Sequence, residues 1–358
     1  MAKIGILGFP NVGKTTLFNA LTGLSAPTAS HPFSTLEPNI GVASVPDEKL
    51  ERAAAVERSV KIVHAQLELL DVPALARPGH GGGLAGQFLG RLRDVEALAI
   101  VLRAFDDVGV PDDESGTDPV AQAEELLLEL ALADFEIFER RRAKIAKEAM
   151  SDASKRGAAD AVAAGTTVLE AGEALRQHSW ETGALKAFRD LAPLTLKPAV
   201  WVVNVGEDSD ADALADAVAA VVPDGDTVVA VSAQLEEEAA QLDPEDREEL
   251  FEGFGLGKGA LSRMVQASYT AIGVQSFYTL GPKEAHAWTV RVGASAPEAS
   301  GKIHSDLERG FIRAEVCPID DVIDAGGWDA AKAKGIVNVE GKSYIVTEGD
   351  VILVRFSV

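Results

Sequence analysis

A phosphate-binding motif lies close to the start of the chain. Residues 8–15 are Gly-Phe-Pro-Asn-Val-Gly-Lys-Thr, which satisfies the G-x-x-x-x-G-K-[ST] pattern between an apolar strand and a helix. Glycines in such a loop let successive backbone N–H groups turn towards a phosphate, and the helix N-terminus adds its positive end. Lys14 would bridge the β- and γ-phosphates, and Thr15 would offer its hydroxyl to Mg²⁺. The pattern in this context predicts a nucleoside-triphosphate site.

Two further groups could complete a metal site. Asp71 ends an apolar run at residues 66–71. The Walker B aspartate of P-loop proteins stands at such a strand end and approaches the metal, usually through water. An aspartate that follows a strand can also be a helix N-cap. Between the two motifs, HPFSTLEPN (31–39) is a polar loop in which Ser34 and Thr35 could cap Mg²⁺ and the γ-phosphate. Ser and Thr are ordinary turn residues too, so that role stays open.

These groups need a sheet to position them. Short apolar runs predict strands at residues 3–8, 66–71, 97–105, 199–204 and 227–232, and helical stretches at 14–23, 84–94 and 209–222 fall between them. Strands that alternate with helices imply parallel βαβ crossovers and an open sheet covered on both faces. We therefore expect an α/β fold with a mostly parallel sheet.

Two regions depart from this alternation. Residues 115–194 are rich in Ala, Leu, Glu, Lys and Arg with helical apolar spacing, which predicts an α-helical, coiled-coil insert made of an antiparallel pair with a turn at Gly165. After Gly273 the chain changes to short β-like runs punctuated by Gly and Pro. The expected domains are 1–114 with 195–273 for nucleotide binding, 115–194 for the insert, and 274–358 as a separate mixed α/β module.

Composition limits the class of protein. With 358 residues, 47% of them apolar, the chain is long enough for two or three packed domains. It has neither a signal-peptide core nor a run of roughly 18 apolar residues, so we expect a cytoplasmic protein that does not enter the membrane. The single Cys317 excludes an intramolecular disulfide and any multi-cysteine metal site, and we expect a free, buried thiol there.

The net charge of −23 is unevenly distributed. Residues 206–252 hold much of the acidic excess, whereas 139–156 carries seven Lys and Arg against three acids. A helix over this segment would suit a phosphate backbone. The alternative is a solvated helix face with Glu–Arg and Glu–Lys pairs. The basic side chains concerned are Arg140, Arg141, Arg142, Lys144 and Lys147.

With the phosphate loop, the switch-like loop and the strand-end aspartate in this order, the chain closely resembles the YchF family, the Obg-related P-loop ATPases of the TRAFAC class. The resemblance covers nearly the whole length. It implies an Obg-type G-domain fold, a helical insert and a C-terminal β-grasp (TGS) domain. It also implies an Mg²⁺-dependent ATPase that acts as a regulator at the ribosome or its large subunit, with RNA contacts through the basic helix and the TGS domain. Matching stretches are GFPNVGKTTLFNALTG, HPFSTLEPNIGVASVPDEKL, APEASGKIHSDLERGFIRAEV and EGKSYIVTEGDVILVRFSV.

Under this resemblance the base-binding position favours ATP over GTP. Where GTPases carry Asn-Lys-x-Asp, the chain has Asn204-Val205-Gly206-Glu207, so the lysine stem that packs on the base is missing and the acid is longer. Ser232 and Ala233 fall where the family's last base-contacting loop lies. Without the resemblance, Asn204 is a strand-end turn residue and Glu207 a solvated acid. The remaining expected roles are phosphate binding by Asn11, Val12, Gly13, Lys14, Thr15 and Thr16, catalysis by Lys14 and Thr35, and metal binding by Thr15, Thr35 and Asp71.

The turn after Asp71 departs from the family pattern. The usual D-I-A-G-L has become Asp71-Val-Pro-Ala-Leu75, so the glycine whose N–H meets the γ-phosphate is Ala74, preceded by a rigid Pro73. No Gln follows to position a water, and Leu75 resembles the hydrophobic substitution typical of the family. We therefore expect slow basal turnover. Two alternatives stay open, a nucleotide-binding scaffold with little or no hydrolysis and a GTP-preferring GTPase.

Overall fold

The protein divides into two compact units. The computed structural model describes residues 2–24, 39–73, 86–106, 116–206, 209–239 and 260–357, together with residues 242, 246 and 250. Of residues 86–89 and 260 it describes only the backbone. Contacts separate a larger unit, Ala2–Gly41 with Glu68–Ala271, from a smaller unit, Val42–Leu67 with Ile272–Val358. Residues 42–67, expected from the sequence in the nucleotide-binding domain, therefore group with the C-terminal part of the chain.

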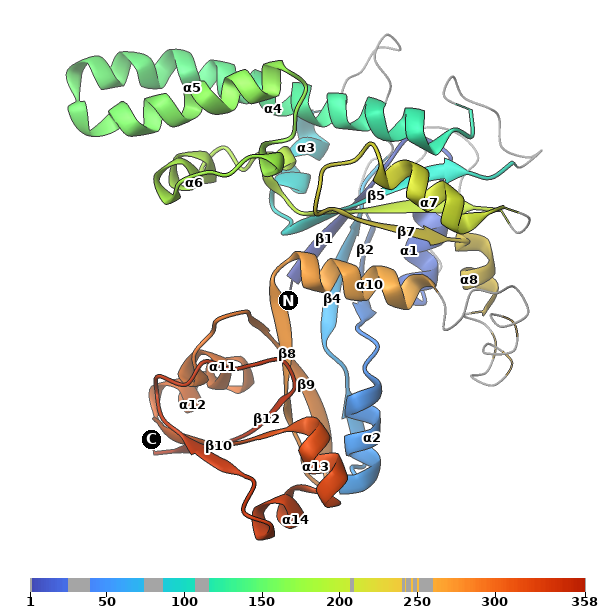
Figure 1. Cartoon of the computed structure of the whole chain (residues 1–358), viewed down its shortest axis with the longest axis vertical. Helices are drawn as coiled ribbons and strands as arrows, with labels where there is room; N and C mark the ends of the chain where they lie inside the picture. The colour runs from blue at the N-terminus through green and yellow to red at the C-terminus, as the bar shows by residue number, and fades with distance from the viewer. Residues whose placement is uncertain are drawn as a thin grey trace. The chain divides into compact units, whose positions relative to one another are not determined.

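A six-stranded sheet organises the larger unit, in the order β2-β4-β1-β5-β6-β7. β1 pairs with β5, β5 with β6 and β6 with β7, all in parallel. β5 and β6 are buried along their whole length, as expected of parallel strands with helices on both faces (Figure 1). The five predicted strands are present, each within one residue at either end, and β2 is additional. The strands are β1 (Ala2–Leu7), β2 (Asn39–Ser44), β4 (Gln66–Asp71), β5 (Ala97–Ala104), β6 (Ala199–Val205) and β7 (Thr227–Val231).

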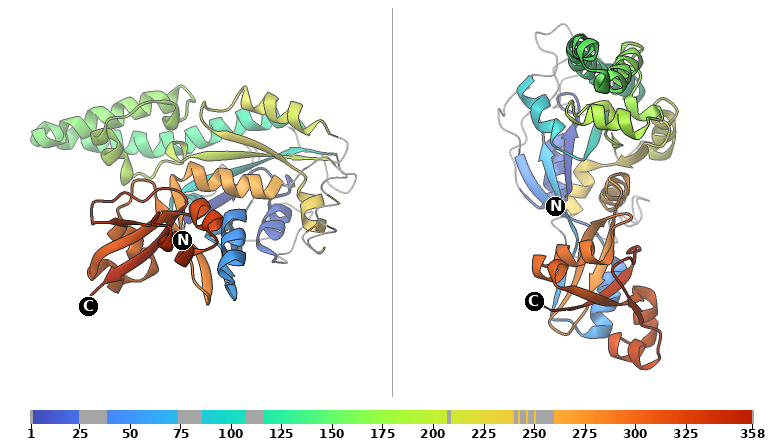
Figure 2. Two further views of the ribbon diagram at one scale, coloured as in Figure 1. Left: turned by 60° about the horizontal axis from the view of Figure 1, so that its bottom comes forward. Right: turned by 90° about the vertical axis from the view of Figure 1, so that its left-hand side faces the viewer.

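Helices cover this sheet and form the insert. In the views of Figures 1 and 2, α4 and α7 lie on one face and α1 and α10 on the other. Short 3₁₀ turns occupy residues 153–155, 175–177 and 194–196. The helices are α1 (Lys14–Thr22), α3 (Gly86–Arg93), α4 (Pro119–Ser151), α5 (Arg156–Glu170), α6 (Thr182–Arg189), α7 (Ala211–Ala219), α8 (Ala233–Ala239) and α10 (Ala260–Ala271).

The insert is a helical hairpin of α4 and α5, backed by α6 (Figure 1). The predicted turn at Gly165 is wrong, because Gly165 lies inside α5 and the chain reverses before Arg156. A Cβ at Gly165 would lie 2.7 Å from the ring of Phe138 and 3.1 Å from that of Phe188. The glycine is therefore there for close packing of α5 on these two rings, and not for a change of direction.

Two buried ion pairs fix the base of the hairpin to the sheet. Asp134 of α4 is fully buried and accepts from Arg93 Nη1 at 3.0 Å and from Thr195 N at 2.7 Å. Arg176 binds Asp226 at 2.6 Å, and Trp201 Nε1 donates to the same carboxylate at 2.9 Å. Thr195 lies four residues before β6 and Asp226 lies immediately before β7, so the insert is anchored near the amino ends of these strands. Buried charges that are paired and hydrogen-bonded in this way fix one geometry, since losing one partner leaves the other uncompensated.

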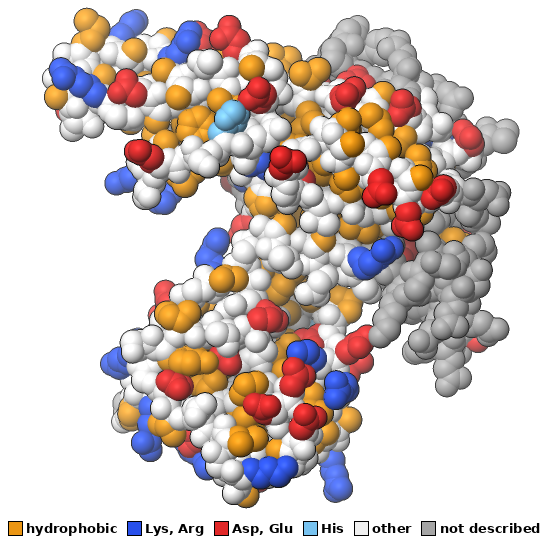
Figure 3. Space-filling view, viewed as in Figure 1, with side chains coloured by type: hydrophobic (Ala, Val, Ile, Leu, Met, Phe, Trp, Pro, Cys, Tyr) orange, Lys and Arg blue, Asp and Glu red, His pale blue; other side chains and the backbone are white. Residues whose placement is uncertain are grey.

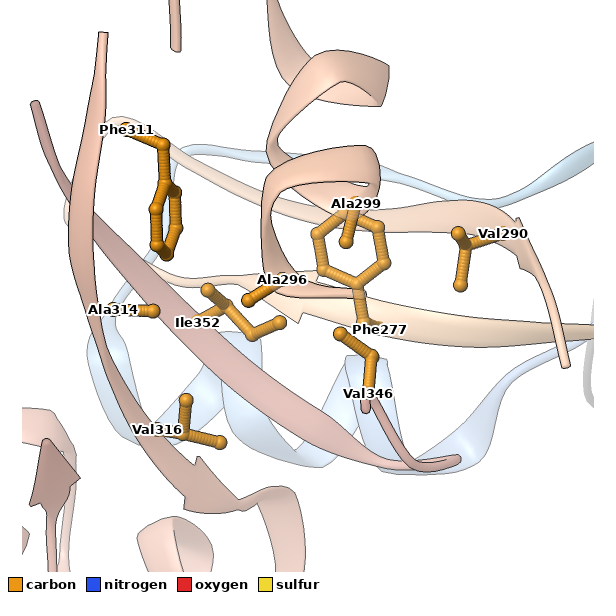
Figure 4. Close-up of a cluster of buried hydrophobic side chains, with 9 residues drawn as sticks. All are labelled: Phe277, Val290, Ala296, Ala299, Phe311, Ala314, Val316, Val346 and Ile352. Carbon is orange, nitrogen blue, oxygen red and sulfur yellow. The ribbon is translucent and has the colours of Figure 1, made fainter. Parts of the chain in front are cut away.

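The smaller unit is a mixed six-stranded sheet, in the order β11-β10-β12-β8-β9-β3. β8–β9, β10–β11 and β10–β12 are antiparallel, whereas β12–β8 and β3–β9 are parallel. Phe277, Phe311 and Ile352 belong to its core, which Figure 4 shows. The elements are α2 (Glu48–Glu57), β3 (Lys61–Val63), β8 (Val274–Thr279), β9 (Glu284–Arg291), α11 (Ala296–Ile303), α12 (Ser305–Arg309), β10 (Phe311–Pro318), α13 (Ile319–Ala325), α14 (Trp328–Ala333), β11 (Asn338–Glu340) and β12 (Asp350–Phe356).

α2 and β3, which lie within residues 42–67, are an integral part of this smaller unit. Tyr278 donates its hydroxyl to Asp47 Oδ2 at 2.7 Å, and Asp47 also caps α2 through Leu50 N. Lys61 on β3 pairs with Glu284 on β9 at 2.8 Å. The unit also contains Cys317, a free and buried thiol as expected.

None of the helices described for this chain combines the length and the apolarity that crossing a bilayer requires.

The packing of Gly165 can be tested against a second glycine of the same helix. Gly165→Ala should lower the free energy of unfolding by about 1–3 kcal/mol, because the added methyl group overpacks the Phe138 and Phe188 rings. Gly157→Ala, whose Cβ would meet no atom within 4 Å, should be neutral or stabilise by up to about 1 kcal/mol through helix propensity. Urea unfolding of both variants measures this. Equal effects at the two positions would contradict the packing role.

Candidate nucleotide-binding site

The phosphate loop joins the central strand β1 to α1, and glycine is required at both of its ends. A Cβ on Gly8 would lie 2.4 Å from the backbone oxygen of Val101 in β5. Gly13 has φ 93°, and a Cβ there would lie 2.2 Å from Asn204 Nδ2. Asn11 is also left-handed, at φ 58°, a conformation that Asn tolerates better than most residues. The loop shape is therefore set by close contact with β5 and β6.

The start of α1 is suited to an anion. Its N-cap residue is Gly13, and no side chain among the described residues accepts a capping hydrogen bond from the first turn. Hence the first N–H groups of α1 are not satisfied by a capping side chain, and they lie at the positive end of the helix dipole. A phosphate group at this position would receive both the hydrogen bonds and the favourable field.

Lys14 is the buried cation of the loop. The residue is 8% exposed, and Nζ donates to the backbone oxygen of Phe9 at 2.6 Å. Burial lowers the pKa of Lys14 to about 8, while the negative charge of Asp71 acts in the opposite direction. A buried ammonium held by a neutral carbonyl is poorly compensated for its lost hydration. An anionic ligand at the loop would supply that compensation.

Asp71 lies at the end of β4, next to the loop. Its Oδ2 accepts from Thr15 Oγ1 at 3.1 Å and from Asn39 Nδ2 at 3.1 Å. Burial raises the pKa of Asp71, whereas the hydrogen bond from Asn39, the charge of Lys14 and the hydrogen bond from Thr15 lower it. A threonine hydroxyl beside a carboxylate is a set of hard oxygen donors, which fits Mg²⁺.

The rest of that metal's ligands would come from nucleotide and water. Within the described ranges, no group of three or more His, Cys, Asp or Glu could hold a metal ion. Mg²⁺ is commonly bound through one or two protein oxygens plus substrate phosphates, so one carboxylate and one hydroxyl suffice.

Asn204 ties three parts of the site together. It is 5% exposed at the end of β6, where Nδ2 donates to the backbone oxygen of Val12 at 2.9 Å and Oδ1 accepts from Ala233 N at 3.0 Å. Val205, Ser232 and Ala233 are buried beside it. The amide thus holds the phosphate loop against the segment that starts α8.

The structure brings most of the predicted residues to one edge of the sheet. The loop residues, Asp71, Asn204 and Ala233 are connected by the contacts above, and Thr16 is half-buried in the first turn of α1. Thr35 and Glu207, like Ser34, Ala74 and Leu75, lie outside the described residues, so their roles stay predictions. Asn39 is a site residue that the sequence did not single out, although it ends the switch-like stretch 31–39. Recognising from the sequence that strand β2 begins at Asn39 and pairs with β4 would have identified this residue.

Comparison with known proteins places this chain in a known family. Two family profiles match, one described as a 50S ribosome-binding GTPase over residues 3–134, and the YchF-type GTPase C-terminal domain, of unknown function, over residues 274–357. The Ribosome-binding ATPase YchF of Bacillus subtilis is 37% identical over 99% of both chains. That of Escherichia coli O157:H7 is 38% identical over 99% of both. The Obg-like ATPase 1 of Oryza sativa is 33% identical over 99% of this chain and 92% of its own.

Solved structures agree with these relatives. The Schizosaccharomyces pombe YchF GTPase superposes with a TM-score of 0.85 at 28% identity, covering 99% of this chain and 97% of the other. A GTP-binding protein from Pyrococcus horikoshii shares the fold, with a TM-score of 0.61 at 18% identity over 99% of this chain and all of its own. The phosphate loop, the helical insert and the C-terminal domain thus occur together in the same order along the whole chain, and the protein belongs to the YchF family.

Proposed function

We propose that this protein is an Mg²⁺-dependent ATPase with slow basal turnover that works with the ribosome in the cytoplasm. The observation that carries the nucleotide part is the buried ammonium of Lys14, held in a glycine-bounded loop at the start of α1. The ATPase and ribosome parts are supported by relatives named ribosome-binding ATPases. A match to a 50S ribosome-binding GTPase profile supports the large subunit as the partner.

In this proposal the phosphates lie on the backbone N–H groups of residues 11–16 and on Lys14. Thr15 and Asp71 would hold Mg²⁺, the former by its hydroxyl and the latter directly or through water, and Thr35 would sense the γ-phosphate. When bound, the metal neutralises charge on the β- and γ-phosphate oxygens. Lys14 is buried and would add positive charge beside the phosphates, and such electrostatic stabilisation is strongest where water is excluded.

The base pocket favours adenine in this proposal. Val205 stands where GTPases have the lysine that packs on the base, and it is buried. The side-chain amide of Asn204 is hydrogen-bonded to the backbone of Val12 and Ala233, so it holds the phosphate loop in place. Glu207, Ser232 and Ala233 would then line the base without the aspartate geometry that reads guanine.

Nucleotide affinity should depend on pH through Lys14. Bound phosphates favour the charged ammonium and raise its pKa, so above about pH 8 the free protein must take up a proton to bind. Affinity is then level below pH 8 and falls above it, by up to about tenfold per pH unit. Calorimetric titration with Mg²⁺ and a non-hydrolysable ATP analogue between pH 7 and 9.5 measures this.

A matched variant separates this effect from other titrations. Lys14→Met keeps a long apolar stem without the charge, so it should bind weakly and with no decline above pH 8. A native chain whose affinity is flat across the range would count against Lys14 as the phosphate ligand.

We propose the far end of the α4–α5 hairpin as the ribosomal RNA contact. Lys and Arg side chains stand out there in Figure 3, and Arg140, Lys144 and Lys147 are exposed. Part of the charge is paired locally, since Glu148 binds both Arg141 and Lys155. Met150 is 87% exposed near the turn. A positive surface on a chain of net charge −23 favours a phosphate backbone as its partner.

Charge reversal on the hairpin should weaken ribosome binding. Lys144→Glu with Lys147→Glu should lower co-sedimentation with large ribosomal subunits and reduce its dependence on salt, because fewer counterions are released. Lys186→Glu with Arg189→Glu makes the same charge change on exposed positions of α6 and serves as the control. If both pairs reduce binding equally, net charge alone is responsible and the hairpin is not the contact.

Two alternatives differ in chemistry. A nucleotide-binding scaffold with little or no hydrolysis is favoured by Pro73, a rigid half-buried residue directly before the turn that should sense the γ-phosphate. A GTP-preferring GTPase is favoured by the name of the profile that matches residues 3–134 and by that of the Schizosaccharomyces pombe structure.

Substitutions in the turn after Asp71 test whether the protein is a nucleotide-binding scaffold or a slow ATPase. Replacing Pro73 by Ala and Ala74 by Gly restores backbone freedom at the turn, so under the scaffold alternative phosphate release should rise at unchanged nucleotide affinity. Single-turnover phosphate release with Mg²⁺-ATP measures the change. Absence of any gain would show that this turn does not impair hydrolysis.

A further inference from the structure

Asn39 reaches the metal side of the phosphate loop from a strand of its own. It is the first residue of β2, half-buried, and its Nδ2 donates to Asp71 Oδ2 at 3.1 Å. β2 and β4 are neighbours in the sheet, so this is a cross-strand contact between the start of one strand and the end of the other. Thr15 is the second donor to the same oxygen.

Two donors on one oxygen fix the direction of the whole carboxylate. Because Oδ2 is held by Thr15 and Asn39, rotation about the Cβ–Cγ bond of Asp71 is restricted and the other oxygen has a defined direction. Thr15 belongs to the phosphate loop and would itself be a metal ligand. Asn39 is therefore the donor whose contribution to Asp71 does not depend on the loop.

The backbone that carries Asn39 is held firmly. Two residues further along β2, a Cβ on Gly41 would lie 2.5 Å from Thr22 Cγ2 and 2.8 Å from the ring of Phe18. β2 thus packs directly on α1, the helix that begins with Lys14. This close approach keeps Asn39 at a fixed distance from the phosphate loop.

We propose that Asn39 is a positioning residue, whose amide holds the carboxylate of Asp71 in the orientation in which it serves Mg²⁺ beside Thr15. The proposal rests on the proposed function, since it requires that the site takes a metal–nucleotide complex. Partners that orient a metal-binding group from outside the ligand set are typically worth 10–100-fold in metal affinity or activity.

Metal affinity tests the role directly in the full-length protein. Mn²⁺ serves as the probe, with ADP present, and its binding is followed by loss of the paramagnetic resonance signal of free Mn²⁺. Asn39→Ala should bind Mn²⁺ at least about tenfold more weakly than the native chain. Asn39→Leu keeps a similar size without the donor and should behave alike. Asn338→Ala, at the exposed first residue of β11, should bind as the native chain does.

A second readout distinguishes positioning from simple loss of structure. ATP hydrolysis by Asn39→Ala should fall at low Mg²⁺ and recover at high Mg²⁺, with the thermal unfolding midpoint unchanged. Native Mn²⁺ affinity in both Asn39 variants would overturn the proposal. So would a fall in ADP affinity that is equal with and without metal, since that would place the effect in the loop. A native chain that binds ADP without retaining any Mn²⁺ would instead refute the proposed metal site itself.

Discussion

Burial of the Lys14 ammonium in a loop of backbone groups is the constraint on which the larger unit depends. Such a charge is tolerated only where the surrounding backbone is fixed and an anion can complete the site. The loop has this fixed shape because Gly8 lies against the backbone of β5 and Gly13 against Asn204 at the end of β6. The parallel register of β1, β5 and β6 therefore sets the geometry of the phosphate site.

The insert and the phosphate loop use opposite ends of this sheet. Asp134 and Asp226 anchor the hairpin where β6 and β7 begin, whereas Asp71 and Asn204 lie where β4 and β6 end. Ligands of open α/β sheets bind at the carboxyl ends of the strands, which leaves the amino ends for structural attachments. Two buried ion pairs hold the base of the hairpin to the sheet, so a ribosome contact at its tip would depend on the orientation of the larger unit.

Features carried by adjacent residues could be predicted from the sequence, and those that depend on contact between distant residues could not. The apolar runs of β1, β4, β5, β6 and β7 predicted five of the six strands of the larger unit's sheet to within one residue at each end, and the motif at 8–15 predicted the phosphate loop. Gly165 was misplaced because a glycine within a helical pattern indicates either a turn or close packing, and only Phe138 and Phe188 decide which. The place of Asn39 in the site depends on β2, and the grouping of 42–67 with the C-terminal unit depends on the pairing of β3 with β9. Strands as short as these leave little hydrophobic pattern in the sequence, so neither could be predicted.

The most direct test of the account is competition between ATP and GTP for one site, followed by phosphate release from whichever binds. Purified protein with Mg²⁺ and a fluorescent ATP analogue would be titrated with each unlabelled nucleotide. The account predicts that ATP displaces the analogue at lower concentration than GTP and that bound ATP is hydrolysed slowly. At least about tenfold tighter GTP binding, which corresponds to about 1.4 kcal/mol, or ATP binding without any phosphate release, would contradict it.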